Sequence, residues 1–196
     1  MSVERDFLEE NCLRTALLSR IGRVEDQVKV AIVQEFQRIG VQEDEQAIFN
    51  YFSRAVDEAQ LVGRWRGAVE SGRVGIGYYQ TAAQYYSYLL HEVGHNILDQ
   101  VEASGGTKIT DNKLEEDFCW RFSRLSCSAL GLPYDERVEE INRRFFFLAF
   151  IRGGGELTEE FFDEIVEEEM KLTGFSPFVF AVRYSDGIPQ KVLLER

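Results

Sequence analysis

The only two histidines of the chain, His91 and His95, stand four residues apart, and Glu92 directly follows the first of them. On a helix, residues i and i+4 share one face, so both imidazoles can reach a single metal ion. A glutamate next to the first ligand can lie beside a metal-bound water and accept its proton. The run His91-Glu92-Val93-Gly94-His95 therefore predicts a zinc site of the H-E-x-x-H type, suited to hydrolysis.

The structural alternative is a helix on which the two histidines are packed in the core and Glu92 is an ordinary acid. Two features favour the metal site instead. The residues before the motif, 85–90, are mostly aromatic or aliphatic, so the polar groups would sit in a shielded place. Gly94 also costs about 1 kcal/mol relative to alanine inside a helix. A neighbouring element that packs closely against this turn would explain that cost, and such packing suits a crowded metal site.

Composition limits the classes of protein to consider. The chain has 196 residues, of which 44% are hydrophobic, and a formal net charge of −12. So acidic a surface repels phosphate backbones, which argues against nucleic-acid binding. No apolar run approaches the ~20 residues of a membrane span, and the first residues lack the features of a secretory signal. The chain has only three cysteines, Cys12, Cys119 and Cys127. Because they are few and odd in number, they suit a reducing compartment, and we expect a cytoplasmic protein.

Apolar periodicity predicts helices through residues 1–60, with breaks at Gly22 and Gly40 and a third helix from near Glu43. A hairpin is expected over 64–79, with Ser71-Gly72 as its turn. Thr81 and Asn112 are expected to open the motif helix and the helix after it. The remaining expected elements are a helix capped by Asp135, a break at 153–155, a helix over 159–173, and a hairpin that pairs 178–184 with 191–194.

These elements predict one α+β domain over residues 1–196, mostly helical. Its parts are an N-terminal helical part (1–60), a metallopeptidase-like core (64–133), and C-terminal helices with a hairpin (134–196). The core is expected to be zincin-like, with a small hairpin or sheet before the motif helix.

A catalytic zinc takes three protein ligands and leaves one position open for water. Since the chain has no third histidine, the remaining ligand must be a carboxylate or a cysteine. The candidates that follow the motif are Asp99, Asp111, Glu115, Glu116, Asp117 and Cys119.

Helical geometry favours Glu116 among them. Mostly small residues recur at spacings of three and four on the next helix; they are Cys119, Ser123, Ser126, Cys127 and Leu130. This stripe would suit close packing on the motif helix, and Glu116 lies on the upstream extension of the stripe. Glu115 extends a bulkier stripe, and Asp117 points away. Glu115 and the aspartates stay open as alternatives. The structural interpretation is that all three acids at 115–117 form a solvated first helical turn, where the helix dipole favours negative charge.

The segments 89–95 and 116–123, followed by Pro133, resemble the ImmA/IrrE family of zinc metallopeptidases. That family shows H-E-x-G-H on one helix and a ligand glutamate on the next. Trp120 stands where the family has asparagine, and Pro133 falls a few residues later than the family pattern. The resemblance implies a cytoplasmic protease that cleaves another protein, often a transcriptional repressor. It also implies Zn²⁺ held by His91, His95 and Glu116, with Glu92 as general base.

The leading hypothesis is therefore a zinc metallopeptidase with a protein or peptide substrate, and with no nucleic-acid or membrane partner. Because no histidine is spare, the group that stabilises the oxyanion must be a tyrosine or an arginine. Tyr78, Tyr79 and Tyr88 are nearby in the sequence. The alternative is a catalytically silent metal-binding or helical interaction module that retains the motif helix. An open coordination position would distinguish the peptidase from this module.

Overall fold

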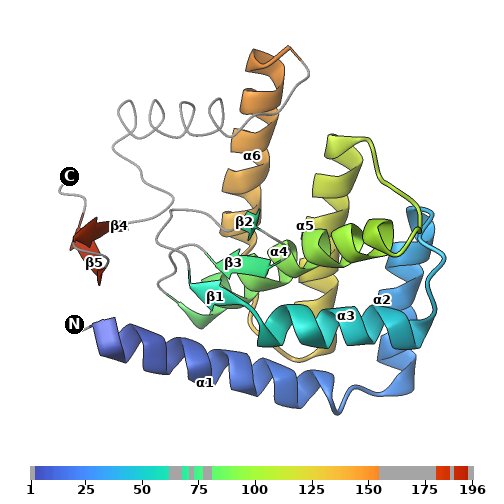
Figure 1. Cartoon of the computed structure of the whole chain (residues 1–196), viewed down its shortest axis with the longest axis horizontal. Coiled ribbons are helices and arrows are strands. Elements are labelled where there is room, and N and C mark those ends of the chain that lie inside the picture. Colours follow the sequence, from blue (N-terminus) through green and yellow to red (C-terminus); the bar gives the residue numbers. More distant parts are fainter. Residues whose placement is uncertain are drawn as a thin grey trace.

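The computed structural model describes residues 3–61, 68–70, 73–76, 81–154, 180–185 and 188–193. In Figure 1, α1, α3 and α4 run across the view, while α2, α5 and α6 run more nearly upright. Helices in these ranges are α1 (Val3–Ile21), α2 (Asp26–Arg38), α3 (Glu45–Asp57), α4 (Ala82–Ala103), α5 (Asn112–Ala129) and α6 (Glu136–Arg152). The strands are β1 (Gln60–Leu61), β2 (Ala68–Glu70), β3 (Arg73–Ile76), β4 (Phe180–Ser185) and β5 (Ile188–Leu193).

The three helices predicted before residue 60 are confirmed. The chain leaves α2 through Gly40, which has a φ of 92°, a left-handed conformation that favours glycine after a helix. Asp44 then caps α3, because its side chain accepts a hydrogen bond from the backbone N–H of Ala47 at 2.8 Å. Local sequence signals therefore determine where α2 ends and where α3 begins.

The expected α+β class is wrong. Helices make up most of the residues that the structure describes. The strands β1, β2 and β3 are two to four residues long. They pair in the order β1-β3-β2, while β4 and β5 pair only with each other. Strands β1, β2 and β3 are too short to form a layer, and β4 and β5, six residues each, form an isolated two-stranded ribbon. The described part of the fold is therefore mainly helical.

Some expected features lie outside the described residues. They include the turn at 71–72, the residues 77–80 before the motif helix, and the helix expected over 159–173. Within the described ranges, no helix combines the length and the apolar composition that crossing a bilayer demands.

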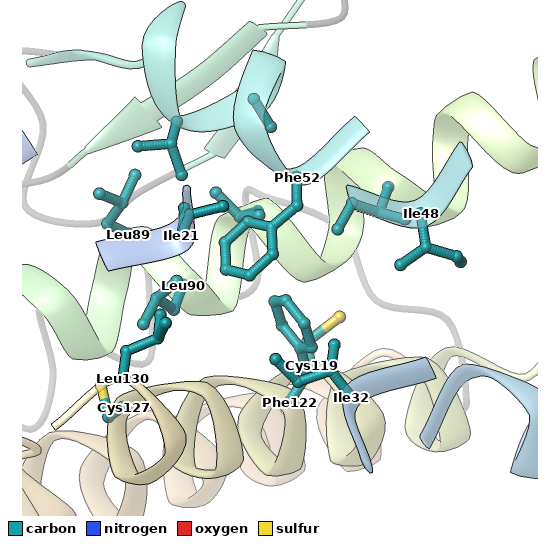
Figure 2. Close-up of a cluster of buried hydrophobic side chains, with 14 of the residues drawn as sticks. Ile21, Ile32, Ile48, Phe52, Leu89, Leu90, Cys119, Phe122, Cys127 and Leu130 are labelled. Carbon is teal, nitrogen blue, oxygen red and sulfur yellow. The ribbon is translucent and has the colours of Figure 1, made fainter. Parts of the chain in front are cut away.

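Aromatic rings join α2, α3 and α5 in the centre of the protein. The ring of Phe36 packs edge-on against Phe118 and Phe122, with centroids 4.8 and 5.3 Å away. Phe52 meets Phe122 in the same manner at 5.4 Å, and Figure 2 shows Phe52 and Phe122 pointing toward each other across this cluster. Edge-to-face pairs of this kind add to the free energy of burial and fix the angle between the helices.

Helix α4 packs closely along α5, as the stripe of small residues predicted. A Cβ atom added to Gly94 would lie only 3.3 Å from the backbone Cα of Cys119. Further along, the Ser123 hydroxyl donates a hydrogen bond to the carbonyl of Ser87 at 2.8 Å, and both residues are fully buried. The cost of a glycine inside α4 is thus explained by the nearness of α5.

Helix α6 is held to α5 by a buried carboxylate. Glu139 accepts hydrogen bonds from Arg124 at 2.6 Å, Tyr134 at 2.6 Å and Arg143 at 2.8 Å. Arg143 also pairs with Asp117 of α5. Burial would raise the pKa of Glu139, but these donors outweigh it and lower that pKa below its ordinary value.

We predict that Glu139→Gln lowers the free energy of unfolding at pH 7 by about 1–3 kcal/mol, since charge-assisted hydrogen bonds are lost. A depressed pKa stabilises the fold above the unfolded value of about 4.3, and this contribution is lost as the pH falls through the folded pKa. Urea unfolding should therefore show the difference from the unmodified protein shrinking below about pH 4. Exposed Glu140→Gln is the matched control, expected to change stability by less than about 0.5 kcal/mol. A difference that does not depend on pH would contradict this account.

Candidate metal centre

The two helices that carry the candidate ligands begin at well-defined caps. Thr81 caps α4, as predicted, by accepting a hydrogen bond from the backbone N–H of Gln84 at 3.2 Å. The cap of α5 is Asp111 rather than the expected Asn112, because the Asp111 carboxylate accepts from the N–H groups of Lys113 and Leu114. An aspartate satisfies two backbone donors here with one oxygen, which fixes where α5 starts.

His91, His95 and Glu116 meet between α4 and α5. The two Nε2 atoms lie 3.3 Å apart, and they lie 3.5 Å (His91) and 3.3 Å (His95) from oxygens of the Glu116 carboxylate. Ligand atoms placed tetrahedrally at 2.0–2.1 Å from zinc would be about 3.3–3.4 Å from one another. The spacing of these three groups therefore fits one zinc ion, and they form a potential metal-binding cluster in the described residues.

The other candidates for the third ligand have different surroundings. Asp111 caps α5, Asp117 pairs with Arg143, and Asp99 is exposed on α4. Cys119 is buried, and burial raises the pKa of its thiol to about 12, so it stays a neutral thiol at pH 7. Of the six candidates weighed in the sequence, Glu116 is thus the one whose carboxylate faces both Nε2 atoms.

Two further side chains orient the three candidate ligands. The Nδ1 atom of His95 lies 2.7 Å from the carboxylate of Glu115, an arrangement that fixes the ring and leaves Nε2 free for a metal. Trp120 donates its indole N–H to Glu116 at 3.0 Å and stacks on the His91 ring at a centroid distance of 3.9 Å.

Sequence reasoning missed both of these roles. It weighed Glu115 only as a ligand and Trp120 only as a departure from a family pattern. The signal for Trp120 was present in its spacing of four from Glu116, which places the two side chains on one helical face.

Burial and charge leave the site ready for a cation. Burial lowers the pKa of His91 to about 3, so this imidazole is neutral. Burial alone would raise the pKa of Glu116, but the two histidines and Trp120 outweigh it and lower that pKa to about 2. Burial opposes protonation of His95, but its contacts with Glu115 and Glu116 contribute to a pKa well above the ordinary value. A metal ion bound here would compete with protonation of this ring.

Glu92 and Tyr88 also lie in buried positions of α4. Glu92 is 8% exposed and adjoins His91 in the chain, where the motif requires a general base. Tyr88 is 2% exposed, and its hydroxyl accepts a hydrogen bond from Asn142 at 3.2 Å. This tyrosine is therefore held in the core by Asn142. Tyr78 and Tyr79, the other two tyrosines considered for oxyanion stabilisation, lie outside the described residues.

No family model, curated protein or solved structure matches the chain at a significant level. The resemblance to ImmA/IrrE peptidases therefore stays a prediction from the sequence motifs alone.

We predict that the purified chain, without a histidine tag, binds about one Zn²⁺ per molecule. His91→Ala and Glu116→Ala should each abolish stoichiometric binding, because two ligands do not hold zinc tightly. Asp99→Asn, which changes an exposed acid one turn from His95, is the control and should keep the metal. Elemental analysis after dialysis measures the content. Zinc retained by Glu116→Ala would exclude this glutamate as the third ligand.

We predict that Trp120→Phe weakens zinc binding about tenfold or more, in the range typical of lost groups behind metal ligands. Phenylalanine keeps an aromatic ring beside His91 but cannot donate a hydrogen bond to Glu116. Competition with a chromophoric chelator measures the affinity. Trp120→His would restore a donor and should recover part of the loss. An unchanged affinity in Trp120→Phe would show that the indole N–H does not position Glu116.

Proposed function

We propose that the chain is a zinc-dependent peptidase. The observation that carries this proposal is the convergence of two imidazole nitrogens and one carboxylate, from two different helices, at 3.3–3.5 Å from one another. Glu92 adjoins the first of these histidines in the chain, as the H-E-x-x-H pattern requires. Three protein ligands with a neighbouring general base are the set that hydrolytic zinc sites use.

Each residue has a separate task in this mechanism. His91, His95 and Glu116 would hold Zn²⁺, which, when bound, lowers the pKa of a water to about 7 and polarises a scissile carbonyl. Glu92 would accept the proton of that water and pass it to the leaving amine. Glu115 and Trp120 would keep the ligands in place.

Access to the site is compatible with a peptide substrate. The side chains of His95 and Glu116 are 21% and 15% exposed, so the metal position borders the surface on the side of these two residues. We propose that the substrate is a specific cytoplasmic protein, with a transcriptional repressor as the example that the family resemblance suggests.

One observation favours a second candidate function, a silent metal-binding interaction module. His91 and Glu92 are only 5% and 8% exposed, which also suits an ion that stabilises the contact between α4 and α5. In that case a fourth protein group closes the coordination sphere, and no exchangeable water is bound. The two functions therefore differ in the fourth ligand.

We predict that Glu92→Gln keeps zinc and the fold but lowers the rate of hydrolysis about 10²–10⁴-fold, because a general base contributes a factor of this size. The measurement compares new protein N-termini in a cell extract treated with the zinc-loaded protein or with Glu92→Gln. Cleavage sites that appear only with the unmodified protein identify substrates. Equal cleavage by both proteins would exclude Glu92 as the base, and the absence of cleavage by either would favour the silent module.

A further inference from the structure

A groove of about 210 Å³ lies between α5 and α6, and the proposed ligand Glu116 forms part of its wall. The opposite wall belongs to α6 and consists of Phe146, Phe147 and Phe150. The rings of Phe146 and Phe150 are stacked nearly parallel, 6.2 Å apart. An apolar recess therefore adjoins the metal centre directly.

Two of the four charged residues that line the groove neutralise each other, whereas Lys113 is exposed and Glu116 faces the histidines. Arg143 and Asp117 both line it, and they form an ion pair with each other. Arg143 is also bonded to Glu139. A charged group that entered would have to compete with these pairs, whereas an apolar group would only displace water from the three phenylalanine rings.

Phe147 is exposed to an unusual degree for a large apolar residue. Half of its surface, 50%, is exposed, and it lies in the α6 wall of the groove. Ile151, one turn further along α6, is 58% exposed but does not line the groove. Exposed apolar clusters rimmed by polar groups often mark binding sites.

We propose that this groove binds an aromatic or large aliphatic side chain of the substrate, next to the bond that is cleaved. This inference rests on the proposed peptidase function, because it is the shared residue Glu116 that places the groove beside the metal. The volume lies below the 300–1,000 Å³ typical of pockets for drug-sized ligands, and it is suited to one side chain. The groove would thus select substrates by a single apolar residue and leave recognition of the rest to other surfaces.

The test uses the full chain loaded with Co²⁺, whose visible absorption changes when a ligand reaches the metal. Two probes share one metal-binding group: acetohydroxamate, and 3-phenylpropanohydroxamate, which adds a phenyl ring. Burial of that ring should strengthen binding about tenfold to a hundredfold. Phe147→Gln should remove most of this gain, and Phe147→Leu should keep part of it. Ile151→Gln is the matched control, an equally exposed apolar residue of the same helix, and should keep the gain in full.

The outcomes separate this inference from the proposal on which it rests. If Co²⁺ does not bind, the metal site itself fails and the groove loses its role with it. If acetohydroxamate binds but the phenyl ring adds nothing, the metal site stands and the groove is not a substrate pocket. A gain that Phe147→Gln leaves intact also overturns the inference. The inference is also overturned if the chain self-associates through Phe147 and shows no preference for the phenyl probe. The apolar face would then bind a second copy of the chain.

Discussion

The candidate metal centre depends on how closely α4 approaches α5, because Glu116 is on one helix and both histidines are on the other. Gly94 makes this approach possible, since a side chain there would press against the backbone of Cys119. The hydrogen bond between Ser123 and Ser87 holds the same pair of helices further along. Small residues let two backbones approach, and the ligands at one end of the contact come within range of a single ion.

The position of the site between buried helices shapes its electrostatics. A carboxylate and two imidazoles at 3.3–3.5 Å would be unfavourable without a compensating charge. A cation held by all three groups would supply that charge, and metal binding would then be linked to stability.

The sequence allowed the grouping of His91, His95 and Glu116 to be predicted better than the fold class. The pattern at 91–95 predicted a metal site, and helical spacing favoured Glu116, whose carboxylate proved to face both histidines. Helix caps such as Thr81 and Asp135 were local signals and could be read directly. The α+β class was wrong because alternation predicts strands but not whether they join into a sheet large enough to form a layer. The stacking of Trp120 on His91 depends on the angle at which α5 crosses α4, which no local pattern encodes.

X-ray absorption at the zinc edge tests the central claim most directly, because it reports the ligands of the bound ion. The account predicts about four nitrogen or oxygen neighbours at 2.0–2.1 Å, two of them imidazoles, and no sulfur at about 2.3 Å. In His91→Ala the signal of one imidazole should disappear together with most of the metal. A sulfur neighbour, which would implicate Cys119, or an ion surrounded only by oxygen would contradict a site built from His91, His95 and Glu116.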